Sequence, residues 1–172
     1  FDRLLSIKAA LETQFGTAAV NKYFESAYAR EIYNIGKQKD LNELEKFKLD
    51  VQSKIPELSD KFIAYADYKF HEGEENNHIY ATAYLSVHCS NYRELNSAAW
   101  KYYEEVDKSE LLNEALFWAQ KSVRLDENWF NTDTYAHLLY KLDRKAEAKE
   151  AALRSIEVAI RDGYDPAETK TL

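Results

Sequence analysis

The residues that could do chemistry gather in one polar stretch near the middle of the chain. Imidazole, carboxylate and thiolate groups can all bind a metal ion, and this stretch supplies each of them. They are His71, Glu72, Glu74, Glu75, His78, His88 and Cys89. Their spacing matches no metal-binding motif, so we predict no metal site and no bound cofactor.

Cys89 is the only cysteine in the chain. It therefore has no partner for a disulfide within the chain, and no CxxC pair is present. A nucleophilic cysteine needs a lowered pKa and an exposed cleft, whereas a free cysteine is more often a small buried apolar residue. We predict that Cys89 packs rather than reacts.

A second acidic group could supply a general acid and a general base. It consists of Glu104, Glu105, Asp107 and Glu110. Carboxylates in such a pattern are more often solvated helix ends and caps, because the positive end of the helix dipole favours them. We predict no catalytic residue in this chain.

Aromatic side chains offer the other kind of chemistry, which is recognition of a partner. Most of the 24 aromatic residues should lie in the core, but exposed Trp and Tyr are favoured as interface anchors. Repeat proteins use one face of this kind to hold an extended peptide or a partner helix. The candidates for partner binding are Trp100, Tyr103, Trp129, Phe130, Tyr135 and Tyr140.

These residues lie in the only part of the sequence that visibly repeats. Glu114, Ala115, Ala119 and Ser122 recur 33 residues later as Glu147, Ala148, Ala152 and Ser155. A fainter echo, 34 residues before Ala115, comprises Ala81, Leu85, His88 and Cys89. This spacing is typical of helical hairpin arrays such as tetratricopeptide repeats, in which small residues mark the positions where helices cross closely.

The composition favours an all-α protein. With four glycines and two prolines among 172 residues, the chain has few breakers for tight turns but enough for long helices joined by short loops. The formal net charge of −7 disfavours nucleic acid as a partner. No apolar run approaches the roughly 20 residues that span a bilayer, which predicts a soluble protein without a transmembrane segment.

We predict about nine helices, stacked as antiparallel hairpins in a right-handed, tetratricopeptide-like superhelix. Caps and apolar spacing place helices near residues 2–14, 17–36, 41–51, 56–73, 79–87, 91–103, 107–125, 132–142 and 147–163. All four glycines then fall at helix ends. The chain is expected to form a single domain, with divergent hairpins in residues 1–90, two clear repeats in residues 91–163 and a tail in residues 164–172.

Residues 95–169 also resemble the C-terminal, tetratricopeptide-like region of a group of bacterial thioredoxin-like proteins, and residues 1–91 resemble it more loosely. The similarity is carried by residues 95–100, 103–107, 114–119, 122–126 and 133–142. It implies a thioredoxin domain ahead of residue 1 and an exported, periplasmic location. No catalytic cysteine carries over. The sequence departs from the usual repeat at Glu127, where proline is common, and at Asp143, where glycine is common.

Two classes of function stay open. The first is a non-catalytic interaction scaffold that binds a protein, a peptide or the implied thioredoxin domain. The alternative is a helical-toroid hydrolase or lyase, in which His71, His78 and His137 would converge with carboxylates on one pocket. The chain begins at Phe1 without an initiator methionine, and we expect it to be a fragment of a longer protein.

Overall fold

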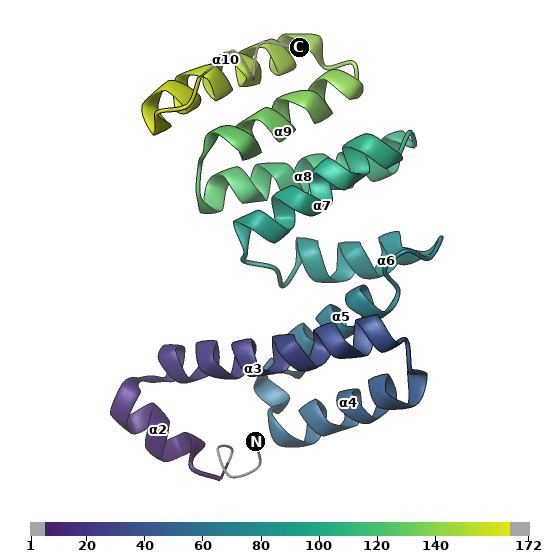
Figure 1. The fold of residues 1–172 in the computed structure, drawn as a ribbon, viewed down its shortest axis with the longest axis vertical. Coiled ribbons are helices and arrows are strands. Elements are labelled where there is room, and N and C mark those ends of the chain that lie inside the picture. The colour runs from purple at the N-terminus through teal and green to yellow at the C-terminus, as the bar shows by residue number, and fades with distance from the viewer. Residues whose placement is uncertain (1–5, 166–172) are drawn as a thin grey trace. The chain divides into compact units, whose positions relative to one another are not determined.

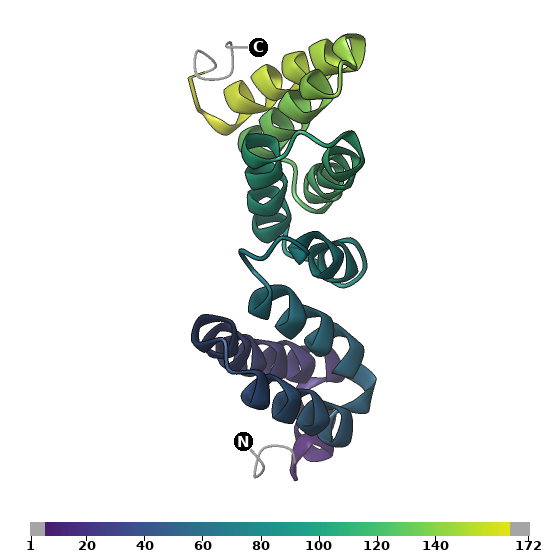
Figure 2. The same cartoon turned by 90° about the vertical axis from the view of Figure 1, so that its right-hand side faces the viewer.

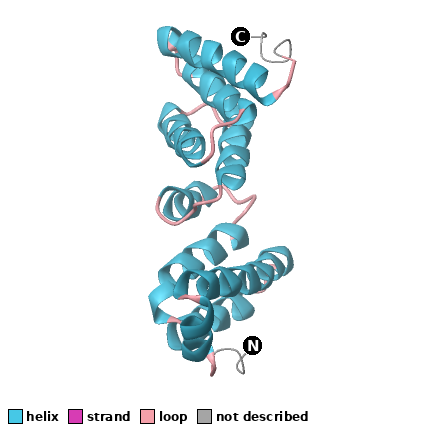
Figure 3. Cartoon of the chain, turned by 90° about the vertical axis from the view of Figure 1, so that its left-hand side faces the viewer, coloured by secondary structure: helices cyan, strands magenta, loops and turns pink. Residues whose placement is uncertain are grey.

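Helices account for all the regular secondary structure in residues 6–165, the part of the chain that the computed structural model describes (Figures 1 and 3). Nine α-helices lie in this part, which confirms the predicted all-α class and the number of helices. The chain divides into two units, Phe1–Tyr84 and Leu85–Leu172, and each is described by itself. The expected single domain over residues 1–172 stays a prediction.

The first unit contains helices α2 to α6. They are α2 (Lys8–Phe15), α3 (Thr17–Gln38), α4 (Leu41–Lys54), the short 3-10 helix η1 (Pro56–Leu58), α5 (Ser59–Phe70) and α6 (Asn77–Ala81). The start that we predicted for the first helix, at Asp2, lies outside the described residues. Asp40 caps α4, because its side chain accepts hydrogen bonds from the backbone N–H groups of Asn42 and Glu43.

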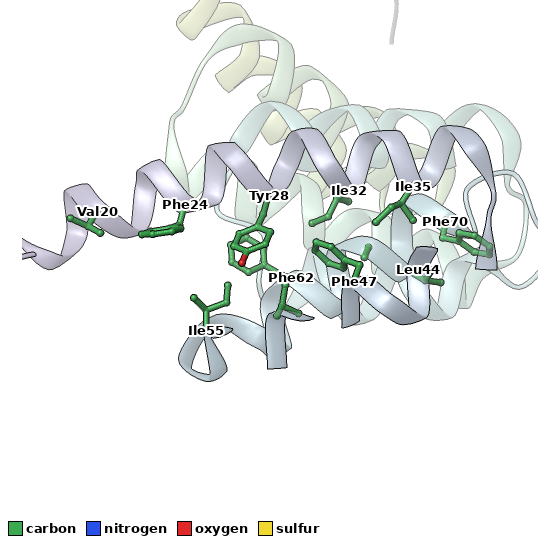
Figure 4. Close-up of a cluster of buried hydrophobic side chains, with 12 residues drawn as sticks. Val20, Phe24, Tyr28, Ile32, Ile35, Leu44, Phe47, Ile55, Phe62 and Phe70 are labelled. Atoms are coloured by element: carbon green, nitrogen blue, oxygen red, sulfur yellow. The ribbon is translucent and has the colours of Figure 1, made fainter. Parts of the chain in front are cut away.

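One side of α3 builds the core of this unit, and Figure 4 shows it facing α4 and α5. Apolar residues recur every three or four positions along the helix, so they share one face. They are Val20, Phe24, Tyr28, Ile32 and Ile35. The ring of Tyr28 contacts both Phe47 of α4 and Phe62 of α5, at centroid distances of 5.8 and 4.8 Å. These contacts join three helices in one core.

Gly36 does not end its helix, contrary to our prediction that every glycine lies at a helix end. It lies inside α3, two residues before the end of the helix at Gln38. A Cβ atom at this position would lie 2.8 Å from the backbone carbonyl oxygen of Lys69 in α5. The glycine is therefore needed for a close approach of two backbones rather than for a turn.

The fifth predicted helix exists, but of the apolar residues that we expected on it, Ile79, Ala83, Leu85 and Val87, only Leu85 is buried. α6 continues into a π-helical segment, η2 (Thr82–Ser86). The wider turn of a π-helix rotates the following side chains relative to an α-helix. Tyr84 and Leu85 are buried, whereas Ile79 and Val87 are exposed.

The second unit consists of two helical hairpins. The first pairs α7 (Tyr92–Glu105) with α8 (Ser109–Leu125), and the second pairs α9 (Trp129–Lys141) with α10 (Lys145–Asp162); the second pair lies side by side in Figures 1 and 2. Asn91 caps α7 as predicted. Helix α8 begins at Ser109 rather than at the predicted Asp107, whose carboxylate lies 3.2 Å from the Lys141 ammonium group.

The small residues of the repeat are buried, except Ala152, which is half-buried. Ala115, Ala119 and Ser122 are fully buried in α8, and Ser155 is fully buried in α10. Ser122 donates to the carbonyl oxygen of Tyr92 at 2.7 Å, and Ser155 donates to that of Trp129 at 3.2 Å. Each serine thus ties a second helix to the first residue of its partner helix.

The predicted helix bounds leave residues 128–131 in the turn before α9, but α9 already begins at Trp129. Only Asn128 lies outside α9, and its side chain exchanges hydrogen bonds with Asn131 in a capping box. The Asn131 side chain also donates to Ser122 and to the carbonyl oxygen of Asp126. This buried amide links α8, the turn and α9.

Candidate functional site

Three rings from two helices meet in the second unit. Trp100 and Tyr103 come from α7, and His137 comes from α9. The centroid of the Trp100 ring lies 4.9 Å from that of Tyr103 and 5.4 Å from that of His137, and the Tyr103 and His137 centroids lie 5.2 Å apart. Trp100 and Tyr103 are three positions apart, so they share one face of α7. All three rings are half-buried, and each keeps some contact with solvent.

Asp133 lies one turn before His137 on the same face of α9. Its Oδ2 atom lies 3.4 Å from His137 Nδ1, and the same nitrogen lies 3.0 Å from the Asp133 carbonyl oxygen. Burial raises the pKa of the Asp133 carboxyl group above its ordinary value of 3.8, and the charge of His137 opposes part of that rise. The other carboxylate oxygen, Oδ1, is buried and accepts no hydrogen bond.

Asn96 occupies the corresponding position of α7. It follows the capping residue Asn91 by five positions, as Asp133 follows Asn128, and it lies one turn before Trp100. Its side-chain Oδ1 atom is also buried without a hydrogen bond. We call Asn96, Trp100, Tyr103, Asp133 and His137 the α7–α9 face. It combines three half-buried rings with two polar side chains, each of which has one oxygen atom buried without a hydrogen bond.

Lys141 lies at one end of the α7–α9 face. Its ammonium group donates to the Tyr103 carbonyl oxygen at 2.7 Å and lies 5.5 Å from the centroid of the Tyr103 ring. A cation suits this position, because the last carbonyl groups of a helix have no partner within the helix. The contact also fixes α9 against the C-terminal end of α7.

The six predicted partner-binding aromatics do not form one group. Trp100 and Tyr103 belong to the α7–α9 face, and Tyr140 follows His137 by three positions on α9, where 52% of it is exposed. Trp129 and Phe130 begin α9, and they pack against Tyr164 and Tyr92 respectively, at centroid distances of 5.3 and 6.2 Å. Tyr135 is half-buried and lies two positions from Asp133 and from His137, so it is on the opposite side of the helix.

Sequence reasoning missed Asn96 and Asp133, and it considered His137 only as a possible catalytic residue. A signal was present in the sequence. Asn96 and Trp100, like Asp133 and His137, are a polar residue and a ring four positions apart, and both pairs follow a capping asparagine at the same distance. Two helices with one pattern at one register indicate a shared face.

Two other histidines, His71 and His78, have local partners. His71 stacks on Tyr80 with a centroid distance of 3.9 Å and lies 2.7 Å from a Glu74 carboxylate oxygen. His78 contacts the carbonyl oxygen of Glu75 at 3.4 Å. These two histidines lie in the first unit and His137 in the second. Among residues 6–165, no three His, Cys, Asp or Glu side chains are arranged to hold a metal ion.

Cys89 is buried, as predicted, with 1% of its surface exposed. Its sulfur lies 3.7 Å from the carbonyl oxygen of Asn91 and 3.8 Å from a carboxylate oxygen of Glu94. The echo residues Ala81 and Leu85 are buried as well. These positions therefore serve packing, as the repeat pattern indicated.

Comparison of the chain with models of known protein families, with curated proteins and with solved structures finds no match. Within the described range, no helix combines the length and the apolar character needed to cross a membrane.

Proposed function

We propose that this chain is a non-catalytic interaction module and that it binds a protein or peptide through the α7–α9 face. The observation that carries the proposal is the meeting of Trp100, Tyr103 and His137 across two helices, while each ring stays partly exposed. Rings held rigidly by packing lose little entropy on binding, which makes them effective anchors.

The tetratricopeptide-like character of the hairpins is part of the same proposal. It is supported by the small residues that repeat 33 positions apart and by the matching hydrogen bonds of Ser122 and Ser155. The attachment to a thioredoxin-like domain and the exported location are supported by the sequence resemblance alone. The sequence ahead of residue 1 in the full-length protein tests both, because a CxxC motif within a βαβ pattern is expected there.

The alternative function, a helical-toroid hydrolase or lyase, has one observation in its favour. Asp133 and His137 form a half-buried pair with a distance of 3.4 Å between Oδ2 and Nδ1, and a pair of this kind can orient an imidazole as a general base. The other close pair of a histidine and a carboxylate, His71 and Glu74, lies in the other unit. We favour the scaffold because the rings beside His137 suit recognition.

A peptide-display selection against the chain tests the proposal. The binding site of each selected peptide is mapped by NMR, with the Trp100 indole N–H and the His137 ring as reporters. Trp100→Leu should weaken binding at least tenfold, since anchor residues typically contribute about 2 kcal/mol or more. Trp129→Leu is the matched control, because it removes a tryptophan of the same unit outside the α7–α9 face, and it should change affinity less than threefold (~0.6 kcal/mol).

The variants are compared by circular dichroism so that a loss of fold is not mistaken for a loss of binding. Selected peptides that bind the wild type and both variants equally well would contradict the proposal.

A further inference from the structure

We infer that the first unit binds an aryl phosphate, which is a phosphate group carried on an aromatic ring, in a cavity where the C-terminal ends of α3 and α5 meet. This cavity belongs to the first unit, whereas the α7–α9 face belongs to the second. The inference therefore goes beyond the proposed function. It follows from the cavity, from the three lysines that line it and from one exposed ring.

The cavity has a volume of about 300 Å³, which is at the lower end of the range for small-molecule sites. It opens to solvent, because four of the six residues that line it are exposed. A small ligand or a single side chain can therefore enter. The lining consists of Tyr33, Gly36, Lys37, Lys39, Lys69 and Glu72.

The walls of the cavity are held together by the contact at Gly36. A Cβ atom at this position would lie 2.8 Å from the carbonyl oxygen of Lys69, so the backbones of α3 and α5 lie close together here. The cavity therefore has walls from two packed helices rather than from a loop.

Charge indicates what kind of ligand suits the cavity. The lining carries three ammonium groups and the single carboxylate of Glu72, which gives a local formal charge of +2 in a chain of net charge −7. Asp40, which follows Lys39 directly, does not line the cavity, and its carboxylate caps α4. A local excess of positive charge favours an anion.

Lys39 removes the main obstacle to an anion at this place. The C-terminal ends of helices carry a partial negative charge, which repels anions. The Lys39 ammonium group offsets this charge, because it donates to the carbonyl oxygens of Phe70 and Glu72. An ammonium group has three N–H donors, so one of them remains for a ligand.

The backbone of Lys39 also fits a role at this site. Lys39 ends α3 in the left-handed conformation, with φ of 55°, where glycine is the usual residue. This conformation accompanies the placement of its ammonium group at the end of α5. A glycine would avoid the strain but would supply no cation.

Lys37 and Lys69 add two more cations. Lys37 is exposed in the last turn of α3 and forms no ion pair with any residue in the range 6–165. The Lys69 ammonium group lies 4.6 Å from the centroid of the Tyr68 ring. Lys37 is therefore the cation of the cavity that a ligand can engage most readily.

The choice of lysine favours phosphate over carboxylate. A phosphate group on a ligand carries up to two negative charges and three acceptor oxygens, so it can receive donors from several ammonium groups at once. Lysine binds phosphate as a point charge, whereas a planar carboxylate is matched best by the fork of an arginine. The lining contains three lysines and no arginine.

Tyr33 indicates the body of the ligand. It lies one turn before Lys37 on the same face of α3, and 62% of it is exposed. An exposed ring at the rim of a cavity offers a flat apolar surface on which a second ring can stack. A phosphate held by the lysines would place an attached ring beside Tyr33.

NMR titrations of the 172-residue chain at neutral pH and low salt test the inference. The ligands are phenyl phosphate, inorganic phosphate, benzoate and a blocked phosphotyrosine tripeptide. Phenyl phosphate should shift the backbone amide signals of Gly36, Lys37 and Lys39 in a saturable way. It should bind about fivefold or more tightly than inorganic phosphate, which lacks the ring, and than benzoate, which lacks the second charge.

Two variants separate the cation from the ring. Lys37→Gln should weaken the binding of phenyl phosphate about fivefold or more, and it is expected to fold because Lys37 is exposed. Tyr33→Ala should weaken the binding of phenyl phosphate to the level of inorganic phosphate and should leave the binding of inorganic phosphate unchanged.

Lys22→Gln is the matched control. It removes the same charge from an exposed position of the same helix, about four turns before Lys37 and more than a Debye length away at physiological salt. It should leave the affinity for phenyl phosphate within about twofold. Circular dichroism of each variant confirms that the fold is kept.

The tripeptide distinguishes two sources of an aryl phosphate. Tighter binding of the tripeptide than of phenyl phosphate would assign the ligand to a protein side chain, and weaker binding would assign it to a free small molecule. Three results would overturn the inference: no saturable shift with phenyl phosphate, equal binding of benzoate, or equal effects of Lys37→Gln and Lys22→Gln. None of them bears on the α7–α9 face, which the display selection tests separately.

Discussion

Between residues 6 and 165, two non-glycine residues take the left-handed backbone conformation, and each lies where a helix has just ended. They are Lys39, with φ of 55° after α3, and Asp143, with φ of 59° after α9. Lys39 is held there by hydrogen bonds from its ammonium group to the carbonyl oxygens of Phe70 and Glu72. Asp143 is held less firmly in this backbone conformation, because its carboxylate pairs with the exposed Lys145, at 3.0 Å.

Asp143→Gly should therefore stabilise the chain slightly. Glycine removes the strain of a left-handed residue, about 1 to 2 kcal/mol, and most of that gain is offset by the greater freedom of glycine in the unfolded chain. We expect the free energy of unfolding, measured by urea denaturation, to rise by about 0.5 kcal/mol. Asp143→Val should lower it by about 1 kcal/mol, because a β-branched residue tolerates this conformation poorly. Equal stabilities of the two variants would contradict the argument.

Glu127, the other departure from the usual repeat, acts as a clamp. Its carboxylate accepts hydrogen bonds from Arg154 at 3.0 and 2.8 Å and from Arg161 at 2.9 Å. Arg161 also donates to the Glu127 carbonyl oxygen at 2.8 Å. These bonds join the turn before α9 to α10, which is a function that proline could not perform.

The clamp should make stability depend on pH. The hydrogen bonds from Arg154 first, and then those from Arg161, lower the pKa of Glu127 below its ordinary value of 4.5, although partial burial opposes them. A group whose pKa is lowered in the folded state stabilises it above its ordinary pKa, and this contribution disappears as pH falls through the folded-state pKa. Glu127→Gln should thus be less stable than the wild type at pH 7, and the difference should shrink below pH 4.5.

Urea denaturation over a pH series measures this difference. Glu150→Gln serves as the control, because Glu150 is exposed on α10. A gap between the wild type and Glu127→Gln that stays constant down to acid would show that the clamp contributes through packing rather than through charge.

At the scale of elements, α3 and α5 approach each other closely at Gly36. Alanine favours a helix over glycine by about 1 kcal/mol, so propensity alone predicts that Gly36→Ala is stabilising. The new Cβ atom would lie 2.8 Å from a backbone oxygen of α5, which cannot move aside without shifting the helix. We expect a net loss of about 1 to 3 kcal/mol in the free energy of unfolding.

Asn34 provides the matched control, because it is exposed on the same helix. There, the alanine variant should be more stable than the glycine variant by about 1 kcal/mol. The preference for alanine or glycine should therefore change sign between positions 34 and 36. The same sign at both positions would mean that α3 and α5 separate easily.

The elements themselves were largely predictable, because caps, breakers and apolar spacing are local properties. Asp40, Asn91 and Gly163 mark helix ends in the sequence and in the structure. Two features of the helices could not be predicted from the local sequence. The close approach at Gly36 depends on a residue of another helix, and the π-helical turn at η2 moves the buried face of the fifth helix without any breaker in the sequence.

The candidate site was predictable only in part, for a related reason. Aromatic residue types pointed to Trp100 and Tyr103, but they also pointed to Trp129 and Phe130, which pack near the start of α9. The two pairs of aromatic residues lie at different distances from the asparagines that cap their helices. The first helices of the two hairpins, α7 and α9, are offset by 37 residues, from Asn91 to Asn128. The second helices, α8 and α10, are offset by 33 residues. A single repeat length therefore hides the match of Asn96 with Asp133.

At the scale of the whole molecule, each unit contains the buried residues that hold it together. In the second unit, the fully buried Trp118 donates from its indole N–H to Ser86 at 2.8 Å. Lys121 donates to the carbonyl oxygens of Leu85 and Ser86 at 3.1 and 2.9 Å. The residues that α8 uses in this way, Leu85 and Ser86, lie in η2, so a fragment that keeps these partners should begin ahead of η2.

A fragment of residues 77–172 should therefore fold alone, with a helical circular dichroism spectrum and one cooperative thermal transition. A fragment of residues 91–172 keeps both hairpins but lacks the partners of Trp118 and Lys121. It should be less stable by about 1 to 3 kcal/mol, because a buried donor left without an acceptor loses its hydrogen bond to protein and gains none to water. If the two fragments unfold at the same temperature, the bonds to η2 contribute nothing, and the second unit is defined by its two hairpins alone.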